Sequence, residues 1–143
     1  MTIKQIKFVP DPMLREVALP VETITSETKQ LLDDMAETMY DAPGIGLAGP
    51  QVGESKRLIV MDCSREDEKD ELWQMINPMI TQSSDENSIL EEGCLSIPGH
   101  TSEVSRPDWV NLKFTDINGK EQQIKAEGLL AACVQHEIDH LNG

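Results

Sequence analysis

Five residues near the end of the 143-residue chain, His136 to His140, have types and spacing that could bind a metal ion. They read His-Glu-Ile-Asp-His, and two histidines four residues apart lie one turn apart on one face of a helix. Such a pair can share one ion, and Glu137 can then act as a general base toward a water molecule. The pattern predicts a metal-dependent hydrolase; the alternative is a helix end with two solvated histidines.

A catalytic site of this kind needs a third protein ligand. Only Leu141, Asn142 and Gly143 follow the motif, and none of them has a side chain that normally binds a metal. We therefore expect the third ligand to come from upstream in the chain, as a carboxylate, as His100 or as a cysteine. His100 follows a glycine in a turn, and we interpret it as a solvated loop histidine.

The three cysteines differ in how well their surroundings suit a metal ligand. Cys133 precedes His140 by seven residues, about 10 Å along a helix axis, so we interpret it as a buried residue that packs or lines a pocket. Cys63 ends an apolar strand and is interpreted as structural. Cys94 lies in a segment bracketed by glycines and a proline, which favours the irregular backbone of a ligand loop. A cysteine with two histidines suits a divalent transition metal and leaves a fourth position for water.

A glycine-rich segment, residues 43–51, could bring the backbone close to a ligand. It lacks the Gly-Lys-Ser/Thr ending of a phosphate loop, so nucleotide binding is not expected. Its glycines would let an extended peptide pair with the edge of the segment. Gln51 at its end could donate an amide hydrogen to an oxygen that becomes negative in a transition state; the alternative is a loop with a solvated glutamine.

The charge, cysteine count and length of the chain limit its expected partners, compartment and number of domains. The chain has 12 Lys and Arg against 26 Asp and Glu, a net charge of −14, which disfavours direct binding to nucleic acid or to an anionic membrane. No export signal or membrane-spanning stretch is recognised, and the three cysteines are odd in number, so a cytoplasmic protein with reduced thiols is expected. The length predicts one domain over residues 1–143.

Short helices and strands must position these residues. A helix is predicted over residues 26–40, with Ser26 as its N-cap and an end at Pro43. Strands are predicted over residues 57–62, 74–80, 109–116 and 122–126, the last two joined by a turn at Asn118-Gly119. A second helix is expected to begin near Glu127. This order predicts an α+β fold: short antiparallel β-sheets packed around a central metal-binding helix, with one additional N-terminal helix.

Three segments together resemble the signature motifs of the peptide deformylase family. They are Gly44–Gln51, Glu92–Ser96 and Gln135–His140, in the family's order and with similar spacing. The resemblance covers nearly the whole chain and includes Pro10–Arg15 and Ile76–Pro78. Each motif alone is moderately specific, whereas the combination is highly specific.

The resemblance implies hydrolysis of the N-formyl group from the initiator methionine of nascent chains, which gives formate and a free amino terminus. It implies that Cys94, His136 and His140 hold one divalent transition-metal ion. That ion would natively be Fe²⁺, with Zn²⁺, Ni²⁺ and Co²⁺ also able to occupy the site. Glu137 would take a proton from the attacking water and deliver it to the leaving amine.

The resemblance also assigns residues to the substrate. The formyl oxygen, on becoming negative, would be held by the ion, the Gln51 side chain and the Leu95 backbone N–H. Arg106 would pair with Glu92 behind the metal ligands and so fix the Cys94 segment. The substrate backbone and its methionine side chain would lie against Gly44, Ile45, Gly46, Leu129, Ala132 and Cys133.

Three features depart from the family's pattern. Ala132 is smaller than the branched residue expected there, which should widen the side-chain pocket. Gly49 stands where most members have alanine, so we expect more backbone freedom beside Gln51. The chain stops at Gly143, where bacterial members continue with a strand and often a helix implicated in ribosome contact. It is similar to short forms carried by some bacteriophages, or to a trimmed form, so ribosome docking through that tail is not expected.

Two other functions fit parts of the pattern. The helical motif alone suggests a metalloendopeptidase, although an upstream cysteine ligand speaks against it. A non-catalytic module that binds a metal or a peptide is the second alternative. With the deformylase interpretation, the expected partners are N-formyl-methionyl nascent peptides, bound by a monomer in the cytoplasm of a bacterium or of an infected bacterial cell.

Overall fold

The computed structural model describes residues 3, 4, 6, 14, 17–42, 44–64, 71–94 and 96–142. For residues 90, 91, 97–100 and 102 it describes the backbone only. The predicted loop histidine His100 is among these, and Leu95 and most of the segment 10–15 lie outside the described residues.

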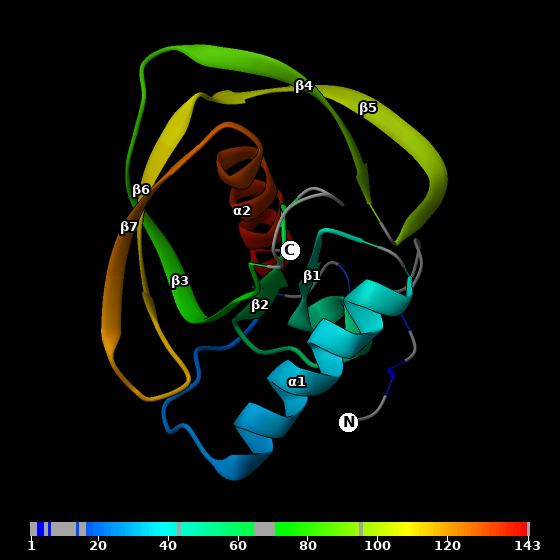
Figure 1. Cartoon of the computed structure of the whole chain (residues 1–143), viewed down its shortest axis with the longest axis vertical. Helices are drawn as coiled ribbons and strands as arrows, with labels where there is room; N and C mark the ends of the chain where they lie inside the picture. The colour runs from blue at the N-terminus through cyan, green and yellow to red at the C-terminus, as the bar shows by residue number, and fades with distance from the viewer. Residues whose placement is uncertain are drawn as a thin grey trace.

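Two α-helices and two antiparallel sheets make up the described chain, which confirms the predicted α+β class (Figure 1). The helices are α1 (Ser26–Asp41) and α2 (Gly128–Leu141), and a short 3-10 helix, η2, covers Gly49–Val52. The strands are β1 (Gly46–Ala48), β2 (Leu58–Met61), β3 (Trp73–Ser83), β4 (Asn87–Cys94), β5 (Ile97–Pro107), β6 (Trp109–Thr115) and β7 (Glu121–Glu127). Five of them form a sheet in the order β1-β2-β3-β6-β7, and β4 pairs with β5 in a separate hairpin.

The helix α2 lies in the middle of the molecule, with the β4–β5 hairpin curving over one end of it and α1 on the far side of β1 and β2 (Figure 1). Strand β2 is buried on both faces, so its residues alternate between two cores. Ile59 and Met61 belong to the core that contains Val134 and Ile138 of α2. The other core lies under α1 and consists of Leu31, Leu32, Met35, Ala36, Met39, Leu47, Val52, Leu58, Val60 and Ile76.

The N-terminus of α1 differs by one residue from the prediction. Thr25, not Ser26, is the N-cap, because the Thr25 hydroxyl accepts a hydrogen bond from the Thr28 N–H at 3.2 Å. The Thr28 hydroxyl in turn accepts the Thr25 N–H at 3.3 Å, which completes a capping box. The predicted apolar face is confirmed, since Leu31, Met35 and Met39 are all buried.

The predicted strands at 57–62, 74–80, 109–116 and 122–126 are confirmed to within three residues at their ends. The turn between the last two is also confirmed, with Gly119 at a φ of +82°. The β4–β5 hairpin is the element that sequence patterning missed. Its described side chains are mostly exposed or half-buried, so backbone pairing defines it without an alternating hydrophobic pattern.

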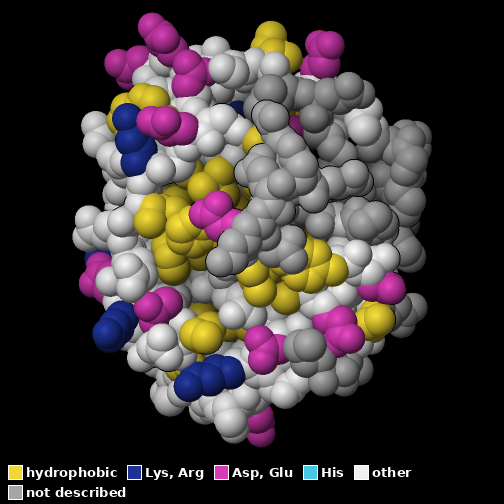
Figure 2. All heavy atoms as spheres, viewed as in Figure 1, with side chains coloured by type: hydrophobic (Ala, Val, Ile, Leu, Met, Phe, Trp, Pro, Cys, Tyr) yellow, Lys and Arg dark blue, Asp and Glu magenta, His cyan; other side chains and the backbone are white. Residues whose placement is uncertain are grey.

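Two further observations concern the molecular surface. Among the described residues, no helix is long and apolar enough to cross a membrane. Acidic side chains are more numerous than basic ones on the face seen in Figure 2, in line with the net charge of −14.

Candidate metal centre and active site

The three predicted metal ligands meet where the end of β4 crosses α2. Cys94 is the last residue of β4, and His136 and His140 lie one turn apart on α2. Their ligand atoms all lie within 4.8 Å of one another, and Cys94 Sγ is 3.2 Å from His140 Nε2. The pairing register of β4 and β5 shifts between Gly93 and Cys94, so the backbone is irregular at the cysteine, as predicted.

A chain of ion pairs orients the first histidine. Nδ1 of His136 lies 3.2 Å from Oε1 of Glu92, which leaves the other ring nitrogen available to an ion. Arg106 holds that carboxylate in turn, with Nε 2.8 Å from Oε2 and Nη2 3.0 Å from Oε1. The structure therefore brings together the predicted pair, Glu92 and Arg106.

Asp139 extends this chain of ion pairs and was missed by sequence reasoning. Its Oδ2 lies 2.9 Å from Nη1 of Arg106, so both ends of the chain of ion pairs belong to α2. In the sequence Asp139 is only an acidic residue between Glu137 and His140, and nothing in the pattern assigns it a role. Its partner could not be identified from the sequence, because Arg106 is 33 residues away and approaches Asp139 only when β5 packs near α2 in the folded chain.

His140 is in the protonation state that a metal ligand requires. Burial, together with the charge of His136, lowers the pKa of His140 to about 4. The imidazole is therefore neutral at pH 7, with a lone pair free for an ion beside the Cys94 sulfur.

Glu137 is buried beside the predicted ligands, with only 4% of the residue exposed. Burial raises the pKa of Glu137 to about 8, and the charges of Cys63 and Glu92 add to the effect. Within the described part of the chain its Oε1 is buried and has no hydrogen-bond partner. A buried oxygen without a partner, next to a thiol and a neutral imidazole, fits a site built for a metal ion and a water molecule.

Gln51 is the buried amide of the site, which overturns the alternative of a solvated glutamine. It is 1% exposed, on η2. Its Oε1 accepts the Ala48 N–H at 2.9 Å, and its Nε2 donates to Ser96 Oγ at 3.0 Å and lies 3.5 Å from Cys94 Sγ. Ser96 was missed by sequence reasoning, because only the tertiary approach of η2 to the β4–β5 hairpin brings it near Gln51. Both ends of the amide are thus held in one orientation.

The expectation that Gly49 loosens this region is wrong. A Cβ at Gly49 would lie 2.6 Å from the carbonyl oxygen of Lys56 and 2.8 Å from that of Glu54. The Glu54 N–H also donates to the Gly49 carbonyl at 3.0 Å. A larger residue would therefore require one of these two backbone segments to shift, and all four residues of η2 are buried.

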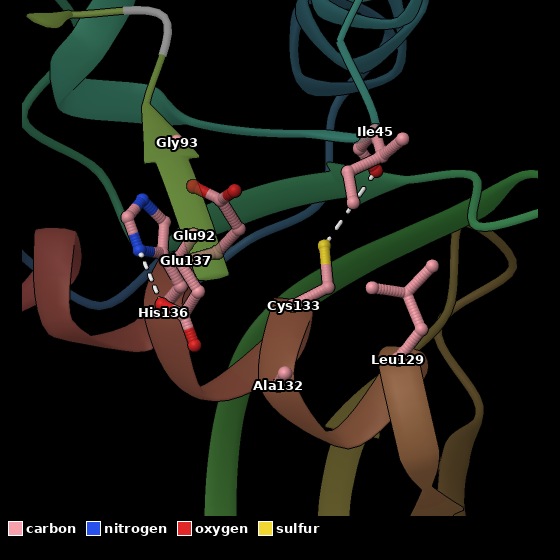
Figure 3. Close-up of a pocket in the computed structure, with 8 residues that line it drawn as sticks. All are labelled: Ile45, Glu92, Gly93, Leu129, Ala132, Cys133, His136 and Glu137. Atoms are coloured by element: carbon pink, nitrogen blue, oxygen red, sulfur yellow. Dashed lines mark hydrogen bonds and ion pairs between the residues drawn. The ribbon is translucent and has the colours of Figure 1, made fainter. Parts of the chain in front are cut away.

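Most of the predicted substrate-binding residues line one cavity of about 90 Å³ beside these groups (Figure 3). Gly46 lies next to it, since a Cβ there would be 2.8 Å from Cys133 Sγ. Gly44 does not line the cavity, and its N–H donates back to Met39 of α1 at 2.7 Å. The lining consists of Ile45, Glu92, Gly93, Leu129, Ala132, Cys133, His136 and Glu137.

Replacement of Gly46 by alanine is expected to displace Glu137. The new Cβ would lie 2.3 Å from Glu137 Oε2, closer than carbon and oxygen can approach, so the carboxylate or β1 must move. We expect kcat/KM for formyl-peptide hydrolysis to fall about a hundredfold, because small misplacements of a catalytic group have effects of that size. Steady-state kinetics with matched metal content checks this, and Gln123→Ala, at an exposed position of β7, is the control. Wild-type kinetics in Gly46→Ala would contradict this packing.

The metal-free protein is expected to lose stability as the pH rises from 6.5 to 8, because below pH 6.5 the lowered pKa of His140 gives stability the opposite pH dependence. The folded chain holds the Glu137 proton with a pKa of about 8, against an ordinary 4.5. The Glu137 proton is thus bound more tightly in the folded state than in the unfolded state, and the free energy of unfolding falls across that window. Denaturant unfolding of chelator-treated protein should show a shallower decline for Glu137→Gln than for the wild type. Equal slopes would mean that Glu137 is not buried as described.

An α+β fold whose helix presents His, Glu and His beside a cysteine is typical of a metal-dependent hydrolase. The family model described as polypeptide deformylase matches residues 3–143. The chain therefore belongs to the peptide deformylase family, and it removes the N-formyl group from nascent polypeptides.

Individual relatives agree with this assignment. The peptide deformylase of Rhizobium meliloti (strain 1021) is 56% identical over 143 residues, which cover 100% of this chain and 82% of that protein. The crystal structure of peptide deformylase from Ehrlichia chaffeensis in complex with actinonin has a TM-score of 0.95 at 43% identity, covering 99% of this chain and 85% of that one. That from Thermotoga maritima has a TM-score of 0.94 at 37% identity, covering 99% and 93%.

Proposed function

We propose that Cys94, His136 and His140 hold one divalent transition-metal ion, natively Fe²⁺, at which the formyl group is hydrolysed. The observation that carries this is the convergence of one thiol and two imidazoles within 4.8 Å. Zn²⁺, Ni²⁺ and Co²⁺ suit the same donors. When bound, the ion supplies Lewis-acid polarisation of the formyl oxygen and a water molecule of lowered pKa.

Glu137 is proposed as the group that moves the proton. The pKa of about 8 belongs to the metal-free chain, and a bound divalent cation would favour the ionised carboxylate. Its Oε1, which has no partner in the described chain, can then accept the proton of the attacking water while the oxygen bonds to the formyl carbon. The carbon–nitrogen bond then breaks, and Glu137 returns the proton to the departing amine nitrogen. One water and one formyl amide thus give formic acid and a free amine.

Gln51 is proposed to stabilise the formyl oxygen as it becomes negative. The bonds to Ala48 and Ser96 hold its amide in place, with Nε2 3.5 Å from Cys94 Sγ at the edge of the ligand group. A donor fixed before the reaction needs no reorganisation when charge develops, and is typically worth about a hundredfold to a thousandfold in rate. The Leu95 backbone N–H is proposed as the second donor by the family resemblance alone.

The peptide is proposed to bind along β1. Among the described strands β1 is at the edge of its sheet and pairs only with β2, so an extended peptide can add beside Ile45 and Gly46. The first side chain would then enter the cavity formed by Leu129, Ala132 and Cys133. Methionine, unbranched and flexible, suits such an apolar space. Because every residue of the site comes from one chain, we propose that the protein acts as a monomer.

Formate release from a formyl-Met-Ala peptide tests the proposed site. Protein purified anaerobically and loaded separately with Fe²⁺, Ni²⁺ or Zn²⁺ should turn over with at least one of the three. Cleavage of internal peptide bonds without formate release would indicate a metalloendopeptidase instead. Tight peptide binding with metal bound and no formate would indicate a binding module.

A further inference from the structure

A second cavity adjoins the first along α2. Its volume is about 160 Å³, larger than the 90 Å³ of the first. Glu92, Leu129 and Ala132 line both cavities. The remaining lining of the second consists of Ser88, Val104, Arg106, Pro107, Asp108 and Gly128, from the β4–β5 hairpin, the residue after it and the start of α2.

The wall between the two cavities is thin. Leu129 and Ala132 are three residues apart, so both lie on the face of α2 that looks toward the hairpin. The Ala132 side chain is a single carbon, drawn on α2 between Cys133 and Leu129 in Figure 3. Leu129 is 52% exposed, and its side chain has free space on one side. A side chain that fills the first cavity therefore meets the Ala132 methyl group, the movable Leu129 side chain and the Glu92 carboxylate, which Arg106 and His136 already hold, before the second.

The chemistry of the second cavity suits the end of an extended side chain. Val104, Pro107 and the Leu129 side chain offer apolar surface along its length. Arg106 is held by Glu92 and Asp139, so its charge is already matched. Ser88 Oγ is likewise hydrogen-bonded to the Asp108 carboxylate. Unbranched aliphatic groups can enter such a space without leaving these polar groups unpaired.

We propose that the two cavities act as one elongated side-chain site and that Ala132 sets its length. This rests on the proposed function, which places the first substrate side chain in the first cavity. The enzyme therefore accepts N-formyl peptides whose first side chain is unbranched and several atoms longer than that of methionine. A branched residue at position 132 would close the passage and restrict the site to side chains of methionine's length.

A chain-length series tests the proposal. Formyl peptides that begin with methionine, S-propyl-homocysteine or S-pentyl-homocysteine differ only at the end of the first side chain. For the wild type we expect kcat/KM on the S-pentyl peptide to be within about threefold of that on methionine. In Ala132→Ile the ratio of the two should fall at least about thirtyfold, since misfit of one or two methylenes changes specificity by about ten- to two-hundredfold. Ala132→Ser, which keeps the size, should retain the wild-type ratio.

Val104→Phe tests the second cavity from the other side. Val104 lies on β5 and lines only the second cavity, so turnover of the methionine peptide should be unchanged. The S-pentyl peptide should lose at least about tenfold in kcat/KM. Melting curves and metal content confirm that each variant is folded and loaded.

Three results would overturn the proposal. The first is a wild-type kcat/KM more than tenfold lower on the S-pentyl peptide than on the methionine peptide. The second is an Ala132→Ile variant with the wild-type ratio of these two values, and the third is a Val104→Phe variant with that same ratio. The last outcome would mean that the long side chain leaves the first cavity toward solvent. Absence of formate from the methionine peptide itself would instead contradict the proposed function, so the two failures are distinguishable.

Discussion

Replacement of Glu137 by glutamine is expected to lower kcat for formate release by about a thousandfold while the bound metal is retained. General acid–base groups typically contribute between about a hundredfold and ten-thousandfold, and here one carboxylate is assigned both proton transfers. The amide keeps the shape of the buried side chain but cannot accept and return a proton. Because Glu137 is not among the three converging ligands, metal content should stay at the wild-type value.

Rates and metal content should be measured on the same preparation, by a formate assay and by elemental analysis. Glu127→Gln is a matched control, since Glu127 is an exposed carboxylate at the start of the same helix. Turnover at the wild-type rate in Glu137→Gln, with metal bound, would remove Glu137 from the mechanism.

Replacement of Cys94 by alanine is expected to abolish both metal binding and turnover. It removes the only thiol that lies with His136 and His140 among the described residues, and two imidazoles alone form an incomplete site. We expect affinity for Fe²⁺ or Zn²⁺ to fall by more than about a hundredfold. Loss of a residue that only hydrogen-bonds a metal ligand typically costs about ten- to a hundredfold, and loss of a ligand itself should cost more.

Competition with a chelating dye measures that affinity directly. Cys63→Ala is the control for metal affinity alone, since Cys63 packs against the hydrophobic core and is not one of the three converging ligands, whereas its charge acts on the Glu137 pKa. Retention of stoichiometric metal and of activity in Cys94→Ala would mean that another residue completes the site.

The parts of the site that sequence predicted are those defined by local spacing or by a distinctive motif. Two histidines four residues apart share a helix face in any α-helix, so His136 and His140 required no knowledge of the fold. Cys94 was predicted to join them because its glycine and proline neighbours indicate an irregular backbone, and the structure places its sulfur beside both histidines. Ser96 and Asp139 could not be identified, since each becomes relevant only when distant elements approach one another.

The same distinction applies to the fold. Strands with one buried face, such as β6, were predicted because Val110, Leu112 and Phe114 alternate with more exposed residues. The β4–β5 hairpin buries little, so backbone pairing defines it and leaves no hydrophobic pattern to recognise. Gly49 was misjudged for a related reason. A glycine in a sequence indicates conformational freedom. At Gly49, however, the carbonyl oxygens of Lys56 and Glu54 lie so close that a Cβ would fit only if one of the backbone segments shifted.

The distance along the chain between Cys94 and His140 has a consequence for chain entropy. The two residues are 46 apart in sequence, and their ligand atoms lie 3.2 Å from each other. An ion held by both would close a loop that contains β5, β6, β7 and α2. By the relation used for disulfide cross-links, closing a loop of that length in the unfolded chain is worth about 4 kcal/mol. An ion that stayed bound to both residues during unfolding would therefore restrict the unfolded chain as a disulfide cross-link does. Unlike a disulfide, this cross-link could be removed with a chelator.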